Sequence, residues 1–131
     1  MLVFAQPVTF SGATVDAGTG GTTGSVTTTP AAGPASEVIV NFTASNAQKV
    51  TVNLLGVSAG GAANPVSVPM SLLLGDVNQT KVVDGNDVSA VQGKTRQPVS
   101  ASTFQYDVNV TGTIDGNDVS TTQGKTRTRL P

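Results

Sequence analysis

The sequence predicts a mixed fold: an all-β sandwich of the immunoglobulin-like kind, complete or short of strands, followed by a small α-helical region. Two observations predict it. Apolar and polar residues alternate through residues 1–74, whereas residues 75–131 contain two near-copies of one acidic loop. At 131 residues the chain can hold one ordinary domain or two small ones. We therefore expect a β domain over residues 1–74 and a second domain over residues 75–131.

The β domain is predicted from runs in which every second residue is apolar. The clearest runs are Val38–Phe42, Val50–Leu54 and Val66–Leu74. A period of two, bounded by Gly, Pro, Asn and Ser clusters, is typical of half-buried strands. Residues 17–34 are rich in Gly and Thr and have Val26 as their one large apolar residue, which predicts a long loop or a weak edge hairpin.

The number of predicted strands is small. About four or five runs qualify, whereas an immunoglobulin-type sandwich has about seven strands. A sandwich that lacks strands leaves apolar faces and edge hydrogen-bonding groups open to another chain. The run Leu2–Phe10 can be the first strand of its own sheet, or it can be donated to a neighbouring chain. Both interpretations stay open at this point.

The acidic loop is repeated with a spacing of 31 residues. Residues 76–96 and 107–127 are identical at 15 of 21 aligned positions. Oxygen-bearing side chains occupy positions 1, 3, 5, 9 and 12 of each loop, which are Asp76, Asn78, Thr80, Asp84 and Asp87 in the first and Asp107, Asn109, Thr111, Asp115 and Asp118 in the second. Calcium takes six to eight oxygen ligands, and a twelve-residue loop can supply them from alternate residues. The spacing therefore predicts two calcium ions, in loops 76–87 and 107–118.

A metal-free explanation of the loops also exists. Asp, Asn and Gly form turns through hydrogen bonds between side chain and backbone. Two loops in one register, holding six of the chain's eight acidic residues, favour calcium. Each loop leads into a short predicted helix, Asn86–Gln97 or Asn117–Arg127. Both helices are poor, because Gly93 and Gly124 each cost about 1 kcal/mol relative to alanine in a helix interior.

Residues 75–131 resemble a dockerin-type repeat pair, the duplicated calcium-loop module of bacterial extracellular proteins. The matching stretches are Gly75–Asn78, Val83–Val88, Tyr106–Asn109 and Ile114–Val119. The resemblance implies one calcium ion per loop, two antiparallel helices, and backbone carbonyl ligands from Val82 and Thr113. It also implies that Asp87 and Asp118 are bidentate, and that Val83 and Ile114 meet across the loops and couple the two sites.

The chain departs from the dockerin pattern at several positions. Thr80 and Thr111 stand at position 5, where an acidic residue or Asn is usual. Lys81 stands at position 6 of the first loop, whereas the second loop keeps Gly112, so we expect the first site to be the weaker one. The helices also lack the long apolar and basic faces by which dockerins bind cohesins. The predicted partner is therefore either a cohesin-like domain or identical subunits.

Several function classes are disfavoured by composition. The chain has no His and no Cys, which removes the most common general base and the thiol nucleophile, so we expect no enzymatic activity. A net charge of -1 without a basic cluster argues against nucleic-acid binding. No stretch reaches the roughly 20 apolar residues of a spanning helix, so no membrane span is predicted.

Three functions remain from the sequence. The first is a non-catalytic, calcium-binding structural module of the bacterial cell surface or exterior, which attaches to a protein partner. The second is a subunit of a self-assembling filament or surface layer, a homopolymer formed by exchange of N-terminal strands. The third, an accessory module of a polysaccharide-degrading enzyme, is disfavoured by the few aromatic residues. The Ser and Thr content and the motif Asn41–Thr43 are compatible with glycosylation.

Overall fold

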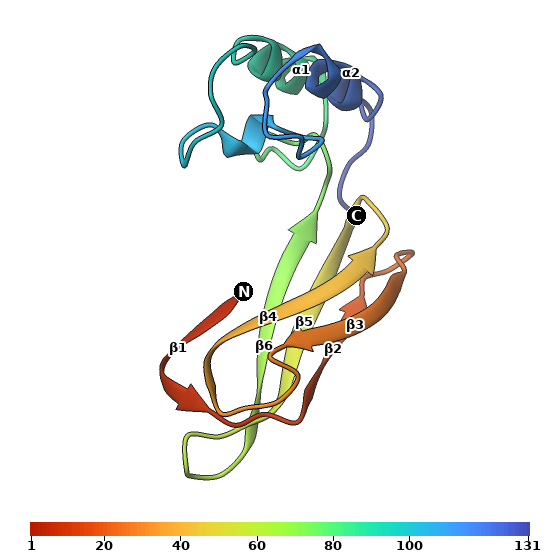
Figure 1. Cartoon of the computed structure of the whole chain (residues 1–131). Coiled ribbons are helices and arrows are strands. Elements are labelled where there is room, and N and C mark those ends of the chain that lie inside the picture. The colour runs from red at the N-terminus through yellow and green to blue at the C-terminus, as the bar shows by residue number, and fades with distance from the viewer. The chain divides into compact units, whose positions relative to one another are not determined.

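The computed structural model describes all 131 residues and divides them into two compact units, Met1–Leu72 and Leu73–Pro131. The first unit contains six strands in two antiparallel sheets. The second contains two short α-helices and one 3-10 turn (Figure 1). The predicted mixture of a β-rich region and a small helical region is confirmed at this level.

Each sheet of the first unit has three strands. One sheet has the order β1–β4–β3, with β1 at Leu2–Val8, β4 at Ala35–Ala44 and β3 at Thr23–Thr29. The other has the order β2–β5–β6, with β2 at Gly12–Ala17, β5 at Gln48–Val57 and β6 at Asn64–Leu72. Six strands exceed the four or five that the sequence predicted, and the count still falls below that of a complete immunoglobulin-type sandwich.

Strand β2 lies outside the alternating runs and was not predicted. The other additional strand is β3, which lies in the segment expected to be a long loop or a weak edge hairpin. It pairs with β4 from Val26↔Phe42 to Thr29↔Ile39 and forms one edge of its sheet. Threonine is β-branched and favours extended backbone. The ladder to β4 therefore stabilises a strand that has almost no apolar residue of its own.

The core of the first unit lies between its sheets. Phe10, Val38 and Leu54 form one buried cluster, in which Val38 belongs to β4 and Leu54 to β5. A second cluster consists of Val15, Val50 and Val52. Val15 lies in β2, outside the alternating runs, whereas the other five residues come from them. The period of two therefore gave the buried positions of β5 correctly, but not those of β6, where Val68 and Met70 are 39% and 41% exposed.

The helices of the second unit are shorter than predicted. Helix α1 spans Gly85–Gln92 and helix α2 spans Gly116–Gln123. The glycines that follow, Gly93 and Gly124, are C-caps and not interior residues. The expectation that each helix continues for several residues past its glycine was therefore wrong. Glycine disfavours helix propagation, and the chain turns at that point.

The start of each helix is closed by two loop aspartates. Asp84 is the N-cap of α1, and Asp87 at the third helical position accepts a hydrogen bond from the backbone of Asp84. Asp115 and Asp118 do the same for α2. The prediction that Asp87 and Asp118 lie in the first helical turn is confirmed, and this is where negative charge is favoured by the helix dipole.

Candidate calcium loops

The side-chain oxygens of the first two predicted ligand positions meet at the backbone amide of the third. The Thr80 N–H donates to Asp76 Oδ1 at 2.9 Å and to Asn78 Oδ1 at 3.1 Å. The other oxygen of Asp76 accepts from the backbone N–H of Lys81 at 2.9 Å. Positions 1, 3 and 5 are thereby drawn to the same side of the loop.

The later positions close the first loop. The Thr80 hydroxyl donates to the Val82 carbonyl at 3.1 Å, which joins positions 5 and 7. The Asp87 carboxylate is fully buried and accepts from Asn78 N–H at 3.1 Å and from Asp84 N–H at 2.9 Å. The carboxylate at position 12 thus bridges positions 3 and 9.

The second loop repeats this arrangement. Asp107 accepts from the backbone of Thr111 at 2.9 Å and of Gly112 at 2.8 Å, and Asn109 accepts from Thr111 at 3.2 Å. Three further bonds complete the loop: the Thr111 hydroxyl to Thr113 O at 3.4 Å, Asn109 N–H to Asp118 at 3.1 Å and Asp115 N–H to Asp118 at 2.9 Å. The loops differ at positions 4, 6, 7 and 8, so the shared residues determine their shape.

The donor set of each loop suits a hard cation. No three acidic side chains lie close enough together to hold a metal ion by carboxylates alone. A calcium ion would therefore also need the amide, hydroxyl and peptide oxygens that the loops bring to the same side. The buried carboxylates of Asp87 and Asp118 each receive two amide hydrogen bonds. A carboxylate can accept about four, so lone pairs remain for a cation.

Backbone conformation distinguishes the two loops at position 6. Both residues there have positive φ, 71° for Lys81 and 85° for Gly112. A left-handed conformation costs a residue with a Cβ about 1 to 2 kcal/mol, and it costs glycine almost nothing. At position 6 the first loop is therefore the more strained, whereas at position 4 the β-branched Val110 of the second loop, with φ 57°, is more strained than Gln79 of the first, with φ 61°.

We expect Lys81→Gly to stabilise the second unit by about 1 kcal/mol, because it removes this strain. Chemical denaturation followed by circular dichroism measures the change. The reciprocal variant Gly112→Lys is the matched control and should destabilise the unit by a similar amount. Equal effects of opposite sign identify the backbone as the cause, whereas a loss of stability in Lys81→Gly would contradict it.

Backbone hydrogen bonds connect the two loops crosswise. The resemblance implied that Val83 and Ile114, at position 8, meet across the loops; both side chains are buried, and their meeting stays a prediction. Val83 N–H donates to Thr128 O, and Val83 O accepts from Arg127 N–H, both at 2.9 Å. Ile114 O accepts from Arg96 N–H at 2.9 Å. Each loop is thus bonded to the segment that follows the other helix.

Isolated bridges reinforce these crosswise bonds. Val82 pairs with Arg129, and Pro98 pairs with Thr113. Residues 96–98 and 127–129 are therefore part of the site's framework, although the sequence analysis assigned them no role. The one signal for them was the repeated sequence Gly-Lys-Thr-Arg after each helix, at 93–96 and 124–127.

Comparison of the chain with protein-family models, with curated proteins and with solved structures gives no match. Neither helix has the length and apolar character needed to cross a membrane. The functional argument therefore depends on the loops themselves.

Proposed function

We propose that this chain is a non-catalytic, calcium-binding structural module of the cell surface or exterior. Its residues 73–131 would be a dockerin-like domain that holds two calcium ions, and its residues 1–72 an immunoglobulin-like sandwich. Together they would attach a protein partner, either a cohesin-like domain or an identical subunit. The observation that carries the proposal is the recurrence of one hydrogen-bond pattern around all six candidate ligand positions of both loops.

The physical basis is coupling between ion binding and folding. The buried apolar residues of the second unit are few, namely Val77, Val83, Val91 and Ile114. Its helices have eight residues each, and isolated helices of that length are marginal in water. A ligand that binds only the folded state stabilises that state. Calcium would also offset the mutual repulsion of the loop aspartates.

We expect the chain to take up two calcium ions, with the second loop binding more tightly than the first. Equilibrium dialysis gives the stoichiometry, and isothermal titration calorimetry gives the two affinities. Magnesium is the control, because it requires near-ideal octahedral geometry and should compete poorly. A chain that takes up no calcium at millimolar concentration would contradict the proposal.

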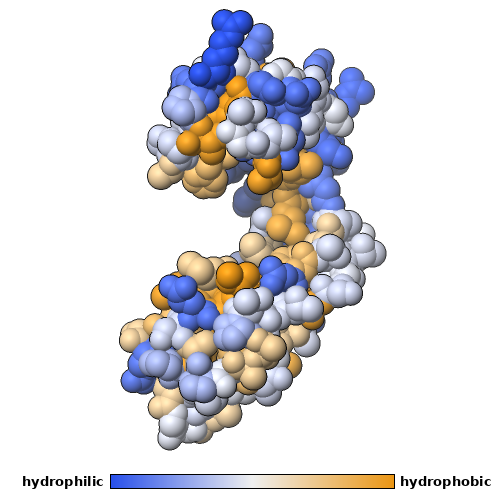
Figure 2. All heavy atoms as spheres, in the orientation of Figure 1, coloured by the Kyte–Doolittle hydropathy of each residue, from blue (hydrophilic) through white to orange (hydrophobic).

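A specific feature of the first unit favours a second candidate function, a self-assembling filament subunit. An apolar groove of about 490 Å³ lies among β1, β4, β5 and β6, with Phe4, Phe42 and Val66 among its lining residues. Apolar side chains reach the surface of this unit (Figure 2), and Met1 and Val3 are 75% and 64% exposed. Strand β1 pairs with β4 irregularly, with a register shift between Val3 and Val8. A weakly held apolar edge strand is suited to exchange between identical chains.

If strands are exchanged, deletion of residues 1–6 should abolish polymers that are visible by electron microscopy. The deletion removes most of β1 and the apolar residues that line its side of the groove, and it spares the buried Val8 and Phe10. Calcium binding should persist in the deletion variant, because the loops belong to the other unit. Polymers that still form without these residues would assign the contact to another surface.

A further inference from the structure

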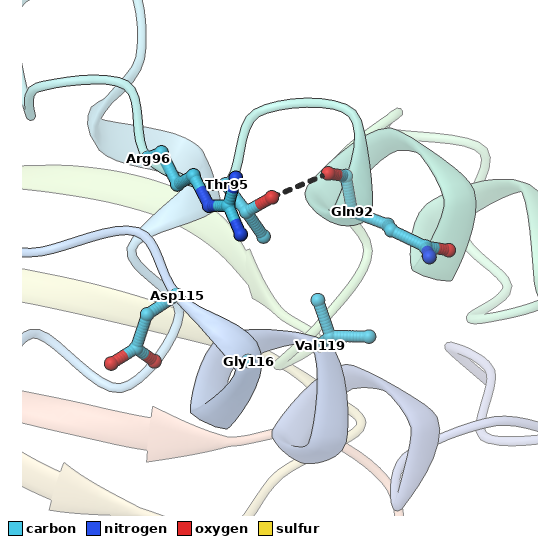
Figure 3. A pocket seen from close by; sticks show the side chains of 6 residues that line it. All are labelled: Gln92, Thr95, Arg96, Asp115, Gly116 and Val119. Atoms are coloured by element: carbon cyan, nitrogen blue, oxygen red, sulfur yellow. Dashed lines mark hydrogen bonds between the residues drawn. The ribbon is translucent and has the colours of Figure 1, made fainter.

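A small pocket in the second unit belongs to neither loop alone. Its cavity volume is about 360 Å³, and it is lined by Gln92, Thr95, Arg96, Asp115, Gly116 and Val119. Gln92 ends α1, and Thr95 and Arg96 follow it. The other three residues lie at the start of α2, where Asp115 is the N-cap. Figure 3 shows Arg96, Thr95 and Gln92 on one side of the hollow, with Asp115 and Val119 on the other. The pocket combines one cation, one carboxylate, several hydrogen-bonding groups and a small apolar floor.

We propose that this pocket binds a uronate unit of an acidic polysaccharide when the second loop holds calcium, an inference that rests on the proposed function. A guanidinium group pairs with a carboxylate through two parallel hydrogen bonds. The amide of Gln92 both donates and accepts, as sugar hydroxyls do. Gly116 and Val119 offer a shallow apolar surface to the C–H face of the ring. These groups fit a sugar acid better than a bare anion.

Arg96 is held at the pocket in a costly conformation. Its φ is 70°, in the left-handed region, and its N–H is bonded to Ile114 O. Asn or Gly would adopt this conformation at lower cost. Strained residues of this kind persist where the surrounding structure holds them, and they cluster at functional sites. Arg127 has the same geometry in the other repeat, with φ 72°.

Calcium in the second loop would let the pocket bind an anion, because it would offset the negative charge of Asp115. This aspartate lines the pocket and is also position 9 of the second loop. Its negative charge opposes a sugar carboxylate unless a cation offsets it. The second unit as a whole has no net charge without calcium, because its six aspartates are balanced by six Lys or Arg residues. Two calcium ions would give it four net positive charges and an attraction for polyanions.

The six lining residues recur with the repeats exchanged. Arg127 follows α2 and is bonded to Val83 O, just as Arg96 follows α1 and is bonded to Ile114 O. The equivalent set has the same six residue types: Gln123, Thr126, Arg127, Asp84, Gly85 and Val88. A polymer with regularly spaced carboxylates could engage both arginines, and two linked contacts bind more tightly than either alone.

The test uses the full chain in millimolar calcium with tetragalacturonate as the probe, measured by isothermal titration calorimetry. The double variant Arg96→Asn with Arg127→Asn should lose roughly tenfold or more in affinity for tetragalacturonate. Its calcium affinity and melting temperature should be preserved, because Asn tolerates the left-handed conformation. The matched control, Lys94→Gln with Lys125→Gln, removes the same charge from residues that line neither the pocket nor the loops and should lose far less.

The outcomes separate this inference from the proposed function. Normal calcium uptake without tetragalacturonate binding overturns the pocket alone, whereas absent calcium uptake overturns both. If both double variants lose the same affinity for tetragalacturonate, net charge alone explains the binding. That result also overturns the proposed pocket. Cellotetraose should not bind, and tetraglutamate and a short single-stranded DNA should bind more weakly than tetragalacturonate. Equal or tighter binding of any of these three would overturn the assignment to a sugar acid.

Discussion

Removal of calcium should unfold residues 73–131 and leave the strands of residues 1–72 in place. Two sites at a hundredfold excess of calcium over Kd contribute roughly 5 kcal/mol. A unit of about 60 residues has a total stability of roughly 3 to 9 kcal/mol. Calcium would therefore supply most of the stability of the second unit, whereas the first unit contains none of the predicted ligands.

Two measurements check this expectation. Far-ultraviolet circular dichroism with and without chelator should lose its helical component and keep its strand component. Hydrogen exchange should lose protection at the crosswise amides of Val83, Arg96 and Arg127, but not at the amides of Val52 and Leu54 in β5. Readdition of calcium should restore both signals. Protection of the crosswise amides that survives chelation would show that the loops are self-sufficient turns.

The β part of the fold was predictable where burial imposes a period of two on the sequence. Val50, Val52 and Leu54 are buried, and their neighbours Thr51 and Asn53 are not. Strand β3 could not be found in this way, because Val26 is its one large apolar residue. It is stabilised mainly by pairing with β4, and pairing between distant segments leaves no local pattern in the chain.

The hydrogen bonding within each loop was predictable from the sequence, and the framework between the loops was not. Side-chain spacing within a loop is local, so the repeated Asp, Asn and Thr positions indicated which oxygens come together. The bonds from Val83 to Arg127 and from Ile114 to Arg96 join residues far apart in sequence. The helix ends were also misjudged, because Gly93 and Gly124 were assigned a cost but not the role of stopping the helix.

Asp118→Asn is expected to destabilise the second unit by about 2 to 3 kcal/mol even before calcium is considered. The carboxylate is fully buried and accepts amide hydrogen bonds from Asn109 and Asp115 through different oxygens. Asparagine offers one oxygen, so its NH₂ group would face an N–H donor. Calcium affinity should also fall, because the predicted bidentate ligand is lost. Chemical denaturation in saturating calcium measures the total loss of stability, and calorimetry measures the part that comes from weaker calcium binding. The difference between the two gives the effect of the lost hydrogen bond.

The matched control is Asp115→Asn, which removes the same charge from the same loop. Asp115 caps α2 through Asn117 N–H at 2.7 Å, and asparagine is an equally good N-cap. The control should therefore lose only the stability that its reduced calcium affinity accounts for. Equal destabilisation of the two variants would contradict the role assigned to the buried carboxylate and would point to lost charge alone.

The crosswise bonds predict a further effect of Asp118→Asn on the first loop. Asp118 lies in the first turn of α2, and the segment after α2 bonds to Val83 in the first loop. Disorder at the second site should therefore loosen the first and reduce its calcium affinity about five- to a hundredfold, the range of ordinary coupling free energies. Asp87→Asn should likewise weaken the second site, because the segment after α1 bonds to Ile114 in the second loop. If the intact loop keeps its calcium affinity in both variants, the crosswise bonds do not couple the two sites.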